Sequence, residues 1–228
     1  ECMATLPHEK NEKLGRVLFS PDQRWLLSTH LTRPLAPASE ARLWNLATRQ
    51  RVARFPIVAA PTAFSPDSTM LATVGTNRTL QLWDLATQRE IRTLKAGGGQ
   101  RALAFSPDGK LLASGEGVFV TRVWEVASGN EIALISGHVG GIFDVAFSPD
   151  GKTLATGSTD DTVKFWNTAI WQEVMTLPDY GKNVSRLIFS PDGSALAVGS
   201  SFGDDERAPV QLWRAPSLAD IDAAGQRN

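Results

Sequence analysis

Short runs of alternating polar and apolar residues, separated by turn-forming residues, fill most of the chain. The clearest stretch begins with two apolar runs, Val145–Phe147 and Thr153–Thr156, joined by the sequence Ser-Pro-Asp-Gly at 148–151. Proline presets φ, aspartate bonds its own backbone and glycine accepts a positive φ, so this sequence predicts a tight turn. The runs Thr162–Trp166 and Glu173–Leu177 follow after further turns. The pattern predicts four short antiparallel strands in about 42 residues.

The same unit recurs along the chain. Its motif stands at Phe19-Ser-Pro-Asp22, Phe64-Ser-Pro-Asp67, Phe105-Ser-Pro-Asp108, Phe147-Ser-Pro-Asp150 and Phe189-Ser-Pro-Asp192. Each copy is followed by one tryptophan between an apolar and a polar residue, at Trp44, Trp83, Trp124, Trp166 and Trp213. The phenylalanines are separated by 45, 41, 42 and 42 residues. A fixed period in this range indicates an array of identical supersecondary units.

The composition of one unit determines how the units assemble. A four-stranded sheet with two apolar faces cannot bury both faces alone, so neighbouring copies must stack. Radial stacking of such sheets gives a β-propeller. We therefore expect an all-β fold of four-stranded antiparallel blades with five repeats.

The repeats resemble those of the WD-repeat family. The Trp-Asp signature is present at Trp83-Asp84 and the Gly-His signature at Gly137-His138. The resemblance covers residues 1 to about 215, which implies one propeller domain at 1–218 and a polar C-terminal tail at 219–228. It also implies a structural tetrad of hydrogen-bonded side chains in the fourth unit. Its members would be His138, Thr156, Asp160 and Trp166, with Ser158 as the alternative hydroxyl.

The first and last units predict how the array ends. No fourth strand follows Trp213, whereas Cys2–Leu6 aligns with the fourth strand Glu173–Leu177. In the WD-repeat family an N-terminal outer strand commonly completes the last blade. Two alternatives follow: a five-bladed ring closed by residues 2–6, or a segment of a longer propeller. We favour the second, because five blades are fewer than the seven typical of the family.

Charge and composition exclude several classes of partner. A net charge of −1 and a pI of about 6.4 provide no basic surface for nucleic acid or an acidic membrane. No apolar run approaches the roughly 20 residues of a membrane span. The single cysteine, Cys2, excludes an internal disulfide and fits a reducing, cytoplasmic location.

No pattern predicts a metal or a cofactor. The three histidines form no pair with metal-ligand spacing. The run Gly97-Gly-Gly99 lacks the Lys-Ser/Thr and the helix of a phosphate-binding loop. The aspartates of the repeated motif are turn residues. We therefore expect no catalytic residues, no cofactor and no small-molecule substrate.

The function implied is that of a non-catalytic protein-interaction scaffold or sensor domain. The uniform repeats resemble those of prokaryotic multidomain signalling proteins, which suggests a part of a larger regulatory protein. The partner would be a protein, a peptide or another domain of the same parent chain. Two alternatives remain: an enzyme with its active site on a propeller face, and a purely structural spacer.

Two sets of residues are candidates for partner binding. Arg16, Asp144 and Arg186 each stand three residues before a motif phenylalanine and resemble ligand-contacting positions of the family. The second set lies in two connections between second and third strands, where the Phe-to-Trp gaps are 25 and 24 residues against 19 in the other units. These loops, Thr29–Ala41 and Ser201–Pro209, contain His30, Arg33, Glu40, Phe202, Asp204, Asp205 and Glu206.

Overall fold

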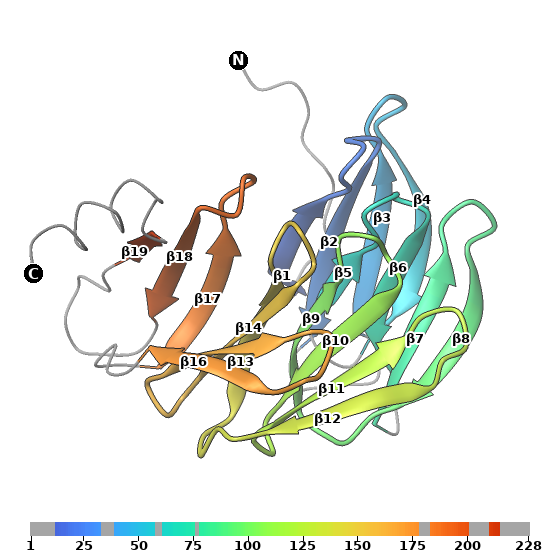
Figure 1. The fold of residues 1–228 in the computed structure, drawn as a ribbon. Helices are drawn as coiled ribbons and strands as arrows, with labels where there is room; N and C mark the ends of the chain where they lie inside the picture. Colours follow the sequence, from blue (N-terminus) through green and yellow to red (C-terminus); the bar gives the residue numbers. More distant parts are fainter. Residues whose placement is uncertain are drawn as a thin grey trace, which may run out of the picture.

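Nineteen strands form five antiparallel sheets in the described part of the computed structural model, which comprises residues 12–32, 39–57, 61–75, 78–177, 183–200 and 210–214. Each sheet contains one copy of the repeated motif, and the sheets follow one another as the blades of a propeller (Figure 1). The all-β, five-repeat propeller expected from the sequence is confirmed.

The strands follow the chain in order within every blade. Blade one contains β1 (Glu12–Phe19), β2 (Trp25–Thr32), β3 (Glu40–Asn45) and β4 (Gln50–Pro56). Blade two contains β5 (Thr62–Phe64), β6 (Met70–Val74), β7 (Thr79–Asp84) and β8 (Arg89–Lys95). Blade three contains β9 (Gln100–Phe105), β10 (Leu111–Glu116), β11 (Val120–Glu125) and β12 (Glu131–Ser136).

The last two blades repeat this order. Blade four contains β13 (Ile142–Phe147), β14 (Thr153–Ser158), β15 (Val163–Asn167) and β16 (Glu173–Leu177). Blade five contains β17 (Val184–Phe189), β18 (Ala195–Ser200) and β19 (Val210–Arg214) within the described residues. Residues 2–6, the expected outer strand of blade five, lie outside the described residues, as does the tail 219–228.

The Ser-Pro-Asp turns are closed by their own side chains. In blade four, Ser148 Oγ donates to Asp150 Oδ1 at 2.6 Å, and Oδ1 also accepts from Lys152 N at 3.1 Å. Gly151 then adopts a φ of 70°, where glycine has no Cβ to clash. All five turns lie on one face of the blades, which we call the SPD face. The opposite face carries the links between blades and is called the connection face.

Apolar clusters between blades form the core. One cluster joins each of the four pairs of successive blades. Between blades three and four, Ile142, Val145 and Leu154 pack with Val123 and Ile135. Each blade thus contributes one face to the blade before it and one to the blade after it, which is the nearest-neighbour stacking expected of repeats.

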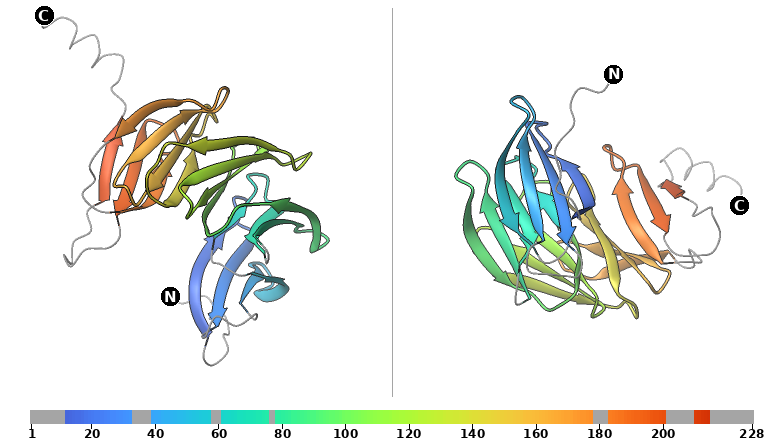
Figure 2. Two further views of the ribbon diagram at one scale, coloured as in Figure 1. Left: turned by 90° about the horizontal axis from the view of Figure 1, so that it is seen from below. Right: turned by 180° about the vertical axis from the view of Figure 1, so that it is seen from behind.

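The blades follow one another around an arc from blade one, in blue, to blade five, in orange and red (Figure 2). No apolar cluster of the described residues joins blade five to blade one. Phe19 of β1 is accordingly 64% exposed, whereas its counterparts Phe105 and Phe147 are each 9% exposed against a preceding blade. Both ends of the described array therefore present apolar surface.

Candidate functional site

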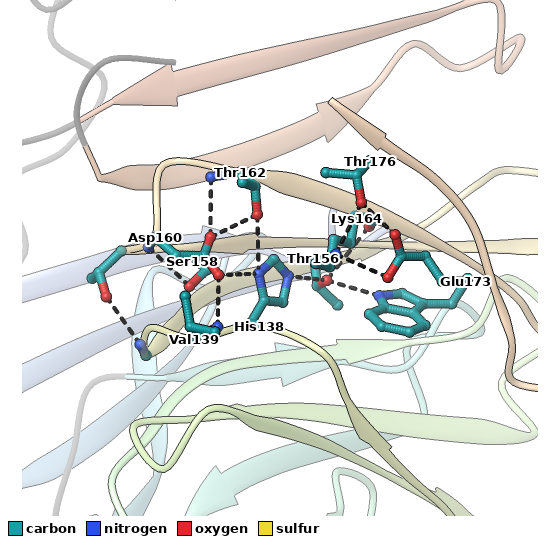
Figure 3. Close-up of polar contacts among 12 residues, drawn as sticks. His138, Val139, Thr156, Ser158, Asp160, Thr162, Lys164, Glu173 and Thr176 are labelled. Atoms are coloured by element: carbon teal, nitrogen blue, oxygen red, sulfur yellow. Dashed lines mark hydrogen bonds and ion pairs between the residues drawn. The ribbon is translucent and has the colours of Figure 1, made fainter. Parts of the chain in front are cut away.

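A chain of hydrogen bonds runs through blade four and joins the four side chains expected in its structural tetrad (Figure 3). Trp166 Nε1 donates to Thr156 Oγ1 at 2.8 Å. Thr156 Oγ1 lies 2.8 Å from His138 Nε2, and His138 Nδ1 lies 2.8 Å from Asp160 Oδ2. The carboxylate of Asp160 also accepts from Val139 N at 2.9 Å and from the Thr162 hydroxyl at 2.6 Å.

The direction of these bonds fixes the proton of the imidazole. Because the Asp160 carboxylate can only accept, the ring proton stands on Nδ1 facing it. In the neutral ring Nε2 then accepts from the Thr156 hydroxyl, whose oxygen accepts from the indole. Burial lowers the pKa of His138, although Asp160 acts in the opposite direction. Burial would raise the pKa of Asp160, but the bonds from Thr162, Val139 N and His138 outweigh it and lower the pKa. The pair is thus a neutral imidazole bound to a carboxylate.

The hydroxyl, imidazole and carboxylate also follow the order of a nucleophilic triad. Thr156 is completely buried, and its oxygen is already occupied by the Trp166 indole. A nucleophile must reach a substrate carbon, so this arrangement serves the packing of blade four.

Blade one contains a related chain of hydrogen bonds, which was not predicted from the sequence. Trp44 Nε1 donates to Ser28 Oγ at 2.9 Å, and Ser28 Oγ lies 2.9 Å from His30 Nε2. His30 is only 3% exposed and belongs to β2, where it pairs with Glu40. The assignment of His30 to an exposed binding loop is therefore wrong, because the hairpin continues past it to Thr32. The Ser-x-His spacing was the available signal, since residues two apart share one face of a strand.

Blade two keeps only one bond of this hydrogen-bonded chain, and blade three has a different buried polar contact. In blade two, Trp83 Nε1 donates to Thr73 Oγ1 at 2.9 Å. In blade three the buried Glu116 carboxylate accepts from Gly97 N at 2.9 Å and lies 3.3 Å from Arg122 Nε. A Cβ on Gly97 would stand 2.1 Å from Glu116 Oε2. Gly97 lies near the position that His138 has in blade four, and its missing side chain makes room for the Glu116 carboxylate.

The first strands of blades one, four and five, which are the inner strands of the propeller, each carry a charged residue near the connection face. Arg186 Nη1 of β17 lies 3.8 Å from Asp144 Oδ2 of β13, which also accepts from Leu187 N at 2.8 Å. Arg16 of β1 is near enough to affect, and be affected by, both partners electrostatically. We call Arg16, Asp144 and Arg186 the axial cluster. Each of the three residues stands three positions before a motif phenylalanine, and the three lie near one another in space.

The pKa values of the axial cluster reflect burial and mutual charge. Burial lowers the pKa of Arg16, the Arg186 charge lowers it further, and Asp144 opposes both. Burial also raises the pKa of Asp144, against the effects of Arg186, Leu187 N and Arg16. Because Asp144 is itself 8% exposed, its carboxylate holds Arg186 and the β17 backbone rather than facing solvent.

The long-loop candidates divide into two groups. Glu40 belongs to β3 and pairs with Arg42, and with Arg54 at 3.5 Å. The loop Thr29–Ala41 is therefore shorter than expected, since both of its ends are strand. Arg33 and the residues Phe202, Asp204, Asp205 and Glu206 lie outside the described residues.

Comparison with known proteins identifies the class of this fold. The family model described as WD domain, G-beta repeat, matches residues 58–84, 88–118 and 129–167. Each matched segment resembles a WD40 repeat, and antiparallel sheets with the same motif stand on both sides of the matched segments. Domains of this family commonly mediate protein interactions and are generally non-catalytic. A search of curated proteins returned no match.

The described residues offer neither a metal-binding cluster nor a membrane-spanning helix. Across the described ranges, no group of three or more His, Cys, Asp or Glu side chains could hold a metal ion. The same residues include no helix of the length and apolarity needed to cross a bilayer.

Proposed function

We propose that this chain is a non-catalytic protein-interaction domain of a larger regulatory protein, and that it binds its partner through the axial cluster on the connection face. The observation that carries this proposal is the approach of Arg186 in blade five to Asp144 in blade four, with Arg16 of blade one within electrostatic range of both. The partner is a separate protein or another domain of the same parent chain.

The charge of the axial cluster favours an acidic group on the partner. The cluster contains two guanidinium groups and one carboxylate, which leaves one positive charge in excess. The Arg186 side chain is 46% exposed and can therefore accept a second carboxylate. Guanidinium groups bind carboxylates through paired N–H donors, which gives orientation as well as affinity.

A purely structural spacer would not require the charged residues of the axial cluster. The positions equivalent to Arg16 and Arg186 are Pro61 in blade two and Ala102 in blade three, and both blades stack without a charged residue there. Asp144 does have a structural role, since it joins β13 to the backbone of β17. The two arginines remain as groups that the stacking of blades leaves unexplained.

The enzyme alternative finds little support in the described residues. Their one arrangement resembling a catalytic triad is closed by Trp166, and the axial cluster lacks a nucleophile. A positively charged cluster on a rigid scaffold is better suited to binding.

The test compares charge variants on the two faces. Wild type, Arg186→Glu and Lys152→Glu would be used to capture partners from the producing cells, and any captured protein would be purified and titrated. Lys152 is exposed in a turn on the SPD face and serves as the control. We expect Arg186→Glu to weaken binding at least tenfold and Lys152→Glu to leave it unchanged. Equal binding by all three proteins would contradict the proposal.

A further inference from the structure

The inner strands carry β-bulges at equivalent positions. Between β9 and β10, Gln100 pairs with Glu116 and Ala102 with Gly115, so Arg101 is the extra residue. Phe143 is the extra residue of β13 in the same way. A bulge redirects a side chain out of the strand ladder, and bulges are common beside functional sites. Because β9 and β13 are neighbouring inner strands (Figure 1), the two redirected side chains can meet.

Arg101 is held against Phe143 at the connection face. Its guanidinium carbon lies 4.3 Å from the centroid of the Phe143 ring, within the range of a cation–π contact. Glycines surround it: a Cβ on Gly117 would stand 3.3 Å from Arg101 Nε, and one on Gly141 would stand 3.9 Å away. The guanidinium is thus oriented by an aromatic ring and bare backbone.

Arg101 also differs from Arg122 and Arg186 in its charge environment. Arg122 pairs with Glu131 at 2.7 Å, and Arg186 approaches Asp144. Within the described ranges, no carboxylate lies within ion-pair distance of Arg101, although the residue is exposed. Its N–H groups are therefore available to an acceptor from outside.

Exposed apolar side chains stand on the adjacent loops. Val118 and Phe119 are 57% and 49% exposed, and Val139 is 83% exposed. The two loops adjoin, since a Cβ on Gly141 would lie 3.6 Å from the Gly117 Cα. Phe119 has a φ of 70°, which is costly for an aromatic residue. Grouped apolar residues on an exposed surface mark interaction sites.

We propose that Arg101, Val118, Phe119, Val139 and Phe143, the Arg101 patch, bind a peptide segment of a partner in which an Asp or Glu stands next to a bulky apolar residue. The carboxylate would accept from the oriented guanidinium, and the apolar side chain would cover the exposed loop residues. A single unpaired guanidinium matches one carboxylate, whereas phosphorylated segments are usually recognised by arginine clusters. Arg anchors rimmed by apolar groups are typical of binding hot spots. The inference rests on the proposed interaction function and assigns it a second contact area.

The test uses synthetic peptides, because it requires no identified partner. Fluorescent nonapeptides with a central Leu-Glu, Phe-Glu, Leu-Asp or Phe-Asp pair, in varied flanking sequence, would be titrated by anisotropy. Each would be matched with its Gln or Asn counterpart and with a phosphoserine version. We expect the best carboxylate peptides to bind at least tenfold more tightly than their amide counterparts. Higher salt should weaken that binding.

Substitutions of residues in the Arg101 patch test whether the peptides bind there. Arg101→Gln should lose at least tenfold in affinity, and Arg101→Lys should be intermediate because it keeps the charge without the planar fork. Phe119→Ser and Val139→Ser should each weaken binding severalfold. Lys110→Gln, an exposed change on the SPD face, should leave it unchanged. Thermal melts would confirm that every variant is folded.

Several results would overturn the inference. They are the absence of any peptide with a Kd below about 1 mM, equal binding by Arg101→Gln and wild type, and a preference for phosphoserine over carboxylate peptides. The proposed function has a separate readout. If Arg186→Glu abolishes partner binding while Arg101→Gln has no effect on partner or peptides, the Arg101 patch is excluded and the axial cluster stands.

Discussion

Ser28 and His30 are two residues apart on β2, and their side chains lie 2.9 Å from each other on the same side of the strand. Ser28 Oγ also accepts from the Trp44 indole at 2.9 Å. In blade one the imidazole therefore comes from the second strand, whereas in blade four it comes from the connection before the first strand. Two blades with different sequences thus satisfy the indole-bound hydroxyl in the same chemical way.

His30→Ala tests this relationship. Loss of the imidazole leaves the buried Ser28 hydroxyl short of one partner, so we expect the free energy of unfolding to fall by about 1–3 kcal/mol. Urea denaturation at neutral pH measures the change, with His138→Ala in blade four as the matched comparison. A His30→Ala protein with the midpoint of the wild type would show that the blade-one chain contributes nothing to stability.

Ser114 and Thr156 occupy equivalent strand positions and should respond in opposite ways to removal of the hydroxyl. Thr156 bonds both Trp166 and His138, whereas the buried Ser114 Oγ has no partner in the part of the chain that the structure describes. Thr156→Val should cost about 1–3 kcal/mol, and Ser114→Ala should be neutral or slightly stabilising. Thermal melts of both proteins check this, and equal losses would refute the difference in bonding.

Gln23 stands where three of the Ser-Pro-Asp turns have glycine. It has a φ of 59°, close to the 71° of Gly109 and the 70° of Gly151. Gln23→Gly removes the steric cost of the left-handed conformation and should stabilise the protein by about 0.5–1 kcal/mol. Urea midpoints would measure the gain, and a loss of stability would contradict it.

Ser68 provides the control, because it shares the φ of 59° but also accepts from Asp22 N of the preceding blade at 3.1 Å. In Ser68→Gly the loss of this bond should offset the relief of strain, so little net change is expected. A gain in Ser68→Gly as large as that in Gln23→Gly would show that the bond between the blades is not stabilising.

Stability should decrease on the acidic side of neutrality, beginning with His138. Its folded-state pKa lies below the usual 6.5, so its contribution is present above pH 6.5 and is lost as the pH falls through the folded-state pKa. The turn aspartates act in the same direction at lower pH, since their pKa values lie below 3.8, with Asp192 at about 2. Asp144 opposes them, because its raised pKa adds stability at low pH.

Urea midpoints at pH 7.5 and pH 5 separate the histidine from the carboxylates. Wild type should lose more stability between these pH values than His138→Gln, which has no titrating group at this position. An identical pH dependence in the two proteins would exclude His138 as the source.

The sequence predicted the features that are encoded within a single repeat. The Ser-Pro-Asp turns follow from fixed spacing within one unit, because strand register repeats with the motif. The blade-four tetrad was predicted from the resemblance to the WD-repeat family. Glu116 was missed because a carboxylate in place of an imidazole has no counterpart in the repeat. Its backbone partner, Gly97, lies 19 residues away in the sequence.

The sites between blades depended on geometry that no single repeat encodes. The approach of Arg16 to Arg186 follows from the curvature of the whole array, which the period does not give. The contact of Arg101 with Phe143 follows from two bulges, whose positions the alternation of residues does not reveal. The error for His30 has a similar cause, since the length of the β2–β3 hairpin determined whether it lies in a loop or a strand.

Site-specific photocrosslinking tests the central claim, that partners bind the connection face near the axial cluster, most directly. A benzophenone amino acid would replace Ser185, which adjoins Arg186 at the bulge of β17, and, in a second protein, Lys152 on the SPD face. The account predicts that irradiation in the producing cells joins one partner, or one other domain of the parent chain, to position 185 and not to position 152. Crosslinks from position 152 alone, or no crosslink from either position, would contradict it.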